Sequence, residues 1–206
     1  GKVDIQSWSN NEVKVIATIM ARDGEDREKL EVILKQNNDH VSVETDYERS
    51  FFGNNHSNAK VDYEIMVPAH IDLDEIDLTN GSLTIQGVKG ELNASLVNGS
   101  ITSDGMSSDT KVDTVNGSIK LTFANNLDDV NNIEVNSVNG SVTLHLPEDL
   151  NASVDAETSN GSIRNEFGLN VVKRRIMGQT LTGELGNGKT QIELDTVNGT
   201  IRLKQL

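Results

Sequence analysis

One short motif recurs in the stretches LVNGSITS (Leu96–Ser103), TVNGSIKL (Thr114–Leu121) and SVNGSVTL (Ser137–Leu144). Each stretch places Asn-Gly-Ser between apolar residues that alternate with polar ones, and this period of two is typical of half-buried β-strands. Asn-Gly followed by Ser or Thr occurs at Asn80, Asn98, Asn116, Asn139, Asn160 and Asn198. A spacing of about 20 residues predicts a repetitive all-β fold, in which each repeat is two strands joined at Asn-Gly.

Two architectures accommodate this repeat. In a meander of hairpins, Asn-Gly is the preferred sequence of a tight type I′ turn. Such hairpins would place acidic residues opposite basic ones, in the pairs Asp113 with Lys120, Glu157 with Arg164, and Asp195 with Arg202. The alternative is a solenoid, in which each repeat is one coil and equivalent residues stack about 4.8 Å apart.

The solenoid explains why the same residue type recurs at the same position of each repeat, which hairpins do not require. Stacked Asn side chains can hydrogen-bond along the stack, Gly suits a corner with positive φ, and a Ser hydroxyl can cap the bend. We therefore favour a right-handed β-helix-like solenoid, with the meander of hairpins as the alternative. The predicted corner ladder comprises Asn80, Gly81, Asn98, Gly99, Asn116, Gly117, Asn139, Gly140, Asn160, Gly161, Asn198 and Gly199.

The interval between Asn160 and Asn198 is 38 residues, close to twice the usual repeat. It predicts a divergent or elongated copy with a turn at Asn187-Gly188. Residues 68–206 would then form about seven short coils.

Residues 1–67 lack the motif and are expected to form an N-terminal α+β cap that belongs to the same domain. Alternating apolar residues predict strands around Val13–Ile19, Val41–Val43 and Val61–Val67. Leu30, Ile33 and Leu34 fit one face of a short helix over Glu25–Lys35. A cover over the open end of a solenoid prevents edge-to-edge aggregation.

The composition excludes several classes of protein. None of the 206 residues is Cys, so disulfides, thiolate metal sites and cysteine nucleophiles are excluded. Aromatic residues make up only 3%, so the core must consist of Val, Ile and Leu. The net charge of -14 opposes binding to nucleic acid or to an anionic membrane surface. The sequence contains no apolar segment long enough to span a bilayer and no recognisable signal peptide.

A specific order of strand, Pro, Asn-Gly, strand and Gly is found in VDYEIMVPAHIDLDEIDLTNGSLTIQGVKGELNASLVNGSI (Val61–Ile101), and the strand pattern continues in VDTVNGSIKL (Val112–Leu121) and SVNGSVTLHLP (Ser137–Pro147). This order resembles the β-strand-repeat putative adhesins, domains of unknown function from bacterial cell envelopes. They are similar to the head domain of putative autotransporter adhesins. The resemblance implies a β-helical fold and a position outside the cytoplasmic membrane, usually through an anchor that this chain does not include. It implies no catalytic residues, because the family has none defined.

Asp72, Asp74 and Asp77 form a local acidic cluster with Glu75, and they are the weak candidates for calcium, which prefers carboxylate oxygens. Neither the GGxGxD repeat of calcium-binding β-rolls nor an EF-hand loop occurs. The sequence therefore predicts no metal site and no cofactor.

A column of acidic residues precedes the corner Asn by three positions, at Asp77, Asp113, Glu157 and Asp195. Two such carboxylates could form the pair that sugar hydrolysis requires. Since Lys120, Arg164 and Arg202 can neutralise their neighbours, we interpret the column as a solvated strand face.

Other chemical motifs are weak. His40, His56, His70 and His145 lack metal-ligand spacing, and HExxH, GxSxG and Walker A sequences do not occur. The basic run Lys173–Arg175 is interpreted as a loop. Four aromatic residues could form a sugar-stacking patch, although we favour a lid over the first coil: Trp8, Tyr47, Phe51 and Phe52.

These observations favour a non-enzymatic, extracytoplasmic protein of the cell envelope or cell surface. It would act as an adhesin-like binding or scaffold domain that presents repeated polar β faces to glycans or other envelope proteins. Neither nucleic acid nor direct membrane contact is expected. Two alternatives stay open: a polysaccharide hydrolase or lyase on a β-helix, and an extracytoplasmic spacer or sensor domain.

Overall fold

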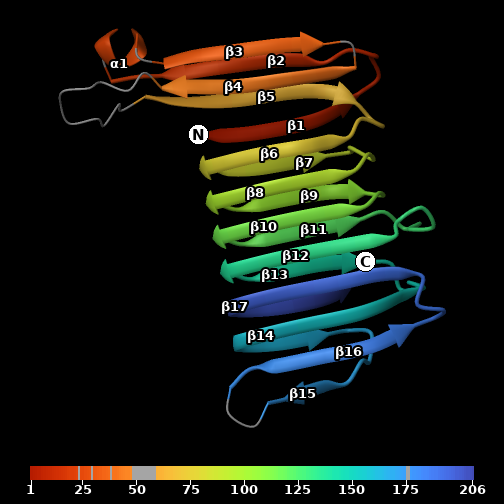
Figure 1. The fold of residues 1–206 in the computed structure, drawn as a ribbon. Helices are drawn as coiled ribbons and strands as arrows, with labels where there is room; N and C mark the ends of the chain where they lie inside the picture. Colours follow the sequence, from red (N-terminus) through yellow and green to blue (C-terminus); the bar gives the residue numbers. More distant parts are fainter. Residues whose placement is uncertain (23, 29, 38, 48–58, 175–176) are drawn as a thin grey trace.

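The computed structural model describes residues 1–22, 24–28, 30–37, 39–47, 59–174 and 177–206. Apart from one short helix, α1 (Gly24–Glu28), the described elements are strands (Figure 1). The strands are β1 (Lys2–Trp8), β2 (Lys14–Met20), β3 (Leu30–Asn37), β4 (His40–Tyr47), β5 (Lys60–Pro68), β6 (Leu73–Asn80), β7 (Ser82–Gln86), β8 (Leu92–Asn98), β9 (Ile101–Met106), β10 (Thr110–Asn116), β11 (Ile119–Phe123), β12 (Asn132–Asn139), β13 (Val142–Leu146), β14 (Ala152–Asn165), β15 (Val171–Lys173), β16 (Gln179–Leu185) and β17 (Thr190–Gln205).

Successive repeats stack as coils, and each coil contributes one strand to each of two layers. The first layer comprises β6, β8, β10, β12 and the N-terminal halves of β17 and β14, and the second comprises β7, β9, β11, β13 and their C-terminal halves (Figure 1). All of these strands pair in parallel, with Asn opposite Asn at each corner. The hairpin meander is therefore wrong, and the parallel stacking expected of a solenoid is confirmed.

The order of the coils departs from the order of the chain. Strand β17 lies between the coil of β12 and β13 and the coil of β14, so that Asn198 pairs with both Asn139 and Asn160. The prediction of an extra copy between Asn160 and Asn198, and with it the count of seven coils, is wrong, because six Asn-Gly corners form the stack. Strands β15 and β16 instead lie in this interval, and they pair antiparallel with each other at the end of the stack.

The N-terminal region extends the second layer. Strand β1 pairs in parallel with β7, β5 pairs in parallel with β1, and β2 lies antiparallel to β5. Strands β3 and β4 form a separate antiparallel hairpin. The helix predicted over Glu25–Lys35 is wrong from Leu30 onward, because Leu30–Asn37 is a strand, and within the described residues no helical cap covers the stack. The apolar residues of so short a run fit both the helical period and the two-residue period of a strand, and pairing with β4 stabilises the strand.

The core is the narrow space between the two layers. Alternate residues of each strand point inward, and those of the central coils are almost completely buried, as for Val112, Ile119, Val135 and Val142. The outward residues of both layers therefore remain in rows on two exposed faces. These faces and the corner carry the acidic column and the corner ladder that the sequence predicts.

Candidate functional site

The corner fixes the spacing of all outer rows. Every corner Asn except Asn80, at the end of the ladder, donates from Nδ2 to Oδ1 of the Asn on the neighbouring coil, at distances of 2.8–3.0 Å. The glycines that follow also lie one over another, and a Cβ on Gly99 would overlap the carbonyl oxygen of Gly81. Because backbone and side chains repeat together at the corner, residues at equal distance from Asn form straight columns, one strand spacing apart.

The outer face of the first layer is acidic. Its carboxylates stand three and five residues before the corner Asn, at Glu75, Asp77, Asp113, Glu134, Asp155, Glu157, Glu193 and Asp195. We call this surface the acidic face. The stacking brings the predicted column into one row, in which Asp195 lies directly between Asn136 and Glu157.

Polar contacts tie part of the acidic face together. Lys111 pairs with Glu134 at 2.9 Å, and this hydrogen bond lowers the pKa of the Glu134 carboxyl despite partial burial. Asn136 donates to Asp113 at 2.9 Å and to Glu134 at 3.1 Å. These contacts hold the central carboxylates in fixed positions.

Glu157 accepts two hydrogen bonds of 2.5 Å from Arg174, which belongs to the basic run of the sequence. Arg175 lies outside the described residues. Asp195 behaves differently: burial, followed by repulsion from Glu193 and Glu157, raises the pKa of its carboxyl. Ionisation of the Asp195 carboxyl is thus less favourable in the folded protein than in water.

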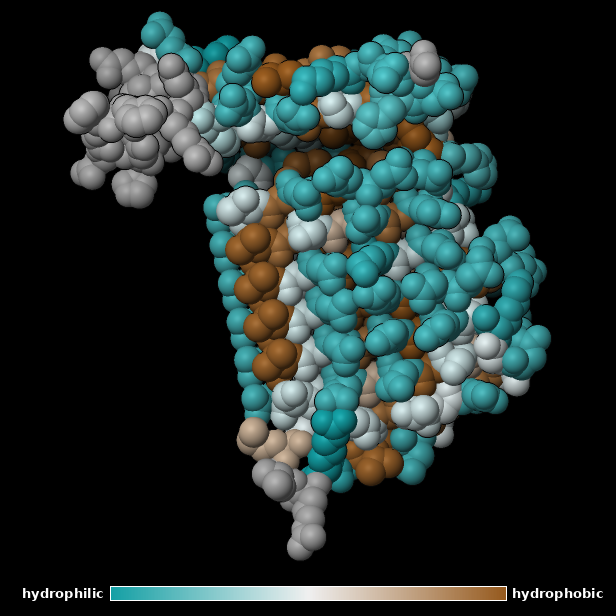
Figure 2. Space-filling model, viewed as in Figure 1, coloured by the Kyte–Doolittle hydropathy of each residue, from teal (hydrophilic) through white to brown (hydrophobic). Residues whose placement is uncertain are grey.

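A groove of about 410 Å³ runs across the first layer beside this row. One side is formed by four exposed valines that stand one residue before the corner Asn, the valine stripe: Val97, Val115, Val138 and Val197. Between 41% and 44% of each valine is exposed. The valine stripe forms a brown line beside the hydrophilic Asn edge in Figure 2. The other side of the groove carries Asp113, Asn136, Asp195 and Glu157.

The ion pairs predicted from hairpins are wrong. Asp113 points outward from the first layer, whereas Lys120 points outward from the second, because the corner lies between them. The same separation holds for Glu157 and Arg164, and for Asp195 and Arg202. The basic residues are consequently free to form a surface of their own, which the sequence analysis missed.

The calcium candidates are not gathered into a site. Asp72 precedes β6 and accepts a hydrogen bond of 2.9 Å from the backbone N–H of Glu91, so it holds a loop. Among the described residues, no three His, Asp or Glu side chains lie together in a way that could hold a metal. Asp74 and Asp77 lie on the exposed side of β6.

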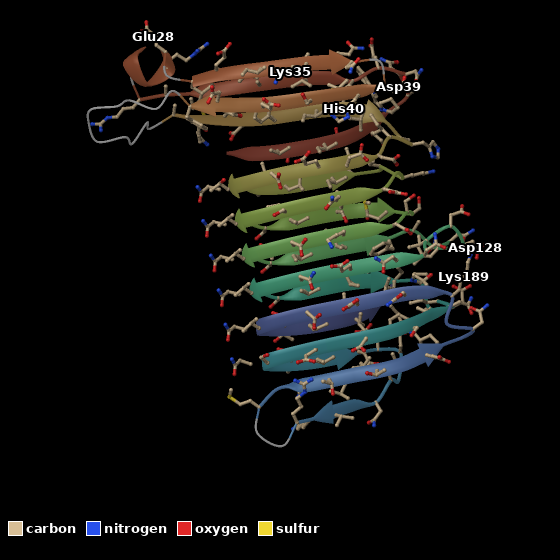
Figure 3. The ribbon with its side chains drawn as sticks, in the orientation of Figure 1. Glu28, Lys35, Asp39, His40, Asp128 and Lys189 are labelled. Carbon is tan, nitrogen blue, oxygen red and sulfur yellow. The ribbon has the colours of Figure 1, made fainter. Side chains whose placement is uncertain are left out.

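The remaining candidates are scattered. His40 lies at the turn of the β3–β4 hairpin, at the N-terminal end of the molecule (Figure 3), and His56 is outside the described residues. His70 is in the turn after β5, and His145 faces outward from β13. Lys189 donates to the backbone carbonyl of Asp128 at the side of the stack opposite the corner (Figure 3).

Of the four aromatic candidates, the structure describes Trp8 and Tyr47. Trp8 donates from Nε1 to the carbonyl of Glu12 at 2.9 Å, and Tyr47 at the end of β4 is 45% exposed. Phe51 and Phe52 lie outside the described residues, so both the lid and the sugar-stacking patch stay predictions.

Comparison with known proteins identifies the class. The family described as Toastrack DUF4097 matches residues 74–204, and the chain belongs to this family. A crystal structure of a putative cell adhesion protein from Clostridium sporogenes shares the fold, with a TM-score of 0.53 and 19% identity over 100% of this chain and 88% of the other. The resemblance inferred from the repeats is thereby confirmed. Comparison with curated proteins found no match. No helix in the described part of the chain is long and apolar enough to cross a membrane.

Proposed function

We propose that this domain is a non-enzymatic, extracytoplasmic binding domain of the cell envelope, adhesin-like in function, which presents the groove of its acidic face to glycans. The observation that carries the proposal is the groove itself, in which four valines face a parallel row of carboxylate and amide groups. A sugar ring has an apolar C–H face, which can pack against the valines, and a rim of hydroxyls, which can hydrogen-bond to the carboxylate and amide groups. The likeness to a putative cell adhesion protein supports a surface location.

Rigidity supports the proposal as well. The rows are fixed by backbone pairing and by the Asn ladder, so little conformational entropy is lost when a ligand is bound. A polymer that contacts several rungs at once sums weak contacts along the groove.

The test is a gel-retardation screen against neutral cell-wall and capsular polysaccharides, followed by measurement of polymer length. The double variant Val115→Thr with Val138→Thr removes apolar surface from the groove at almost constant volume, and Val172→Thr is the control because Val172 is exposed on β15, outside the groove. We expect retardation that the groove variant weakens and the control retains. Retardation unaffected by the groove variant would contradict the proposed site.

One observation favours a second candidate, a polysaccharide-cleaving enzyme. Burial raises the pKa of Asp195, this residue neighbours Glu157 on the next rung, and glycosidases use a pair of carboxyl groups. Shortened polymer after incubation, abolished by Asp195→Asn, would establish that function instead. Intact and unretarded polymer would favour the spacer or sensor role.

A further inference from the structure

The outer face of the second layer gathers basic residues although the protein carries a net charge of -14. Four residues after the corner Asn, in spatial order, stand Thr84, Thr102, Lys120, Thr143, Arg202 and Arg164. Two positions further on, His145 and Lys204 occupy neighbouring strands of the next column. We call Lys120, His145, Arg164, Arg202 and Lys204 the basic patch.

Like charges lie side by side in the basic patch. Arg164 and Arg202 are directly paired residues of β14 and β17. Lys204 lies on the same strand as Arg202, two residues further on, and Lys120 and Arg202 flank Thr143 from opposite sides. Adjacent like charges across strands are destabilising, so the fold gains nothing from this arrangement.

Carboxylates do not neutralise the patch directly. In the part of the chain that the structure describes, the ion pairs of Lys and Arg are formed elsewhere, and none involves Lys120, Arg164, Arg202 or Lys204. Glu166, which follows β14, accepts a hydrogen bond of 3.0 Å from the backbone N–H of Gln205. Asp104 on β9 is paired with Thr122 at the opposite border of the patch.

Hydroxyl groups line the same face. Two residues after the corner Asn, each of the six coils carries a hydroxyl side chain: Ser82, Ser100, Ser118, Ser141, Thr200 and Ser162. The hydroxyls of Ser162 and Thr200 lie 3.4 Å apart, next to the arginines. Cations and hydroxyls therefore form two adjacent straight columns on a flat surface.

We propose that the basic patch binds an anionic polysaccharide, with the carboxylates of the polymer on Arg164 and Arg202 and its hydroxyls on the neighbouring Ser and Thr column. The planar guanidinium group suits carboxylate, which it can bind through two parallel hydrogen bonds. A sugar polymer carries hydroxyls in a row along its chain, which matches the straight hydroxyl column, whereas the headgroups of a fluid lipid surface form no fixed row. The acidic face on the opposite side repels polyanions, so the polymer docks on one face only.

This inference rests on the proposed function only in taking polysaccharide as the material that the domain meets. The test therefore uses three probes: polygalacturonate as the anionic polymer, dextran of matched length as the neutral one, and phosphatidylglycerol vesicles. The variant is Arg164→Gln with Arg202→Gln. The control, Lys14→Gln with Lys89→Gln, makes the same change in net charge at exposed positions outside the patch.

We expect the dissociation constant for polygalacturonate to rise about tenfold in the patch variant and less than about twofold in the control. Both variants should unfold at temperatures close to that of the parent protein. Equal losses in the two variants, no loss in the patch variant, or binding to vesicles without binding to polygalacturonate would overturn the inference. Retardation by dextran alone, or no binding to any of the three probes, would overturn it, while the proposed function is tested separately by the groove variant in the screen of neutral polysaccharides.

His145 gives a second readout, which does not depend on substitution. Burial lowers the pKa of its imidazole, and Lys120 and Lys204 lower it further, while Glu166 acts in the opposite direction. A polyanion on the patch would offset the two lysines and raise the pKa of His145 in an NMR titration. Binding of polygalacturonate with an unchanged His145 titration would place the polymer elsewhere on the protein.

Discussion

Asn160 donates a hydrogen bond of 3.0 Å from Nδ2 to Oδ1 of Asn198, although the two residues are 38 positions apart. Asn198 in turn donates to Asn139 at 2.8 Å, so it stands between two residues that belong to consecutive repeats. The last strand of the chain thus completes the sheet between two segments that precede it in sequence.

Paired cysteines test this order, and the absence of native Cys makes the outcome unambiguous. Neighbouring strands bring Cα atoms to about 4.8 Å, within the range that a disulfide spans. Asn160→Cys with Asn198→Cys should therefore form a bridge on mild oxidation, detected by mass spectrometry of a non-reduced digest.

The control pair is Asn139→Cys with Asn160→Cys. These positions follow one another in the repeat, but β17 separates them, so their Cα atoms lie about twice the strand spacing apart and cannot be bridged. A bridge in the control and none in the first pair would show that the coils follow the order of the chain.

The local part of the fold could be predicted from the sequence. The apolar residue three positions after each corner Asn, such as Ile101 or Ile119, is buried, because a period of two in a strand fixes which side faces the core. Parallel stacking followed from the recurrence of one residue type at each corner, since Asn pairs best with another Asn.

The position of β17 could not be predicted, because near-identical repeats offer near-identical edges to any partner. Asn198 can pair with Asn160 as well as with Asn139, and the residues around these corners do not specify the order of the strands in the sheet. Leu30–Asn37 was missed for a related reason, since its apolar residues suit a helix until the partner strand β4 is known.

The acidic row was predicted as a row, but its ion pairs were not. Pairing Asp113 with Lys120 assumed a hairpin, and the coil places them on opposite faces. A signal for the basic patch was present, because Lys120, Arg164 and Arg202 all stand four residues after a corner Asn. The sequence alone did not show that these residues lie on one face, because that depends on whether the repeats form coils or hairpins.

The corner glycines should tolerate no side chain. In Gly99→Ala the new Cβ would overlap the carbonyl oxygen of Gly81, a backbone atom that neighbouring strands hold in place. We expect a loss of more than about 4 kcal/mol in the free energy of unfolding, measured by urea denaturation. Gly24→Ala is the control, because no atom lies within 4 Å of its added Cβ. Similar stability of the two variants would contradict the close approach at the corner.

The Asn ladder should be sensitive to loss of a donor. Asn116 donates to Asn98 at 2.9 Å and accepts from Asn139 at 2.9 Å. Asn116→Asp keeps the acceptor, but at neutral pH it sets a carboxylate oxygen against Oδ1 of Asn98. We expect a loss of about 1–3 kcal/mol, measured by urea denaturation.

This loss should depend on pH. The protonated acid can donate to Asn98, so the folded state favours protonation and the pKa of the new carboxyl is raised on folding. Stability relative to the parent is therefore recovered as the pH falls through that pKa. Asn116→Ala is the control, since it loses the same donor without a titratable group, and an equal recovery in the control would refute the ladder as the cause.

The ionised carboxylate of Asp195 should lower the free energy of unfolding at neutral pH. Its folded pKa is raised, chiefly by burial and then by Glu193 and Glu157, so ionisation is less favourable in the folded than in the unfolded protein. The fold loses stability as the pH rises from the unfolded pKa through the folded one, and the full cost is present above both. Asp195→Asn should thus stabilise the protein at pH 7, by up to about 1 kcal/mol for this partly exposed group. The gain should shrink toward about pH 4, where the unfolded carboxyl also becomes protonated.

The control is Asp113→Asn, which should show no such gain, because Asp113 accepts a hydrogen bond from Asn136 that an amide satisfies less well. Urea denaturation of the three proteins at both pH values measures this difference, and a gain in Asp195→Asn that does not vary with pH would assign it to the new amide instead of to the lost charge.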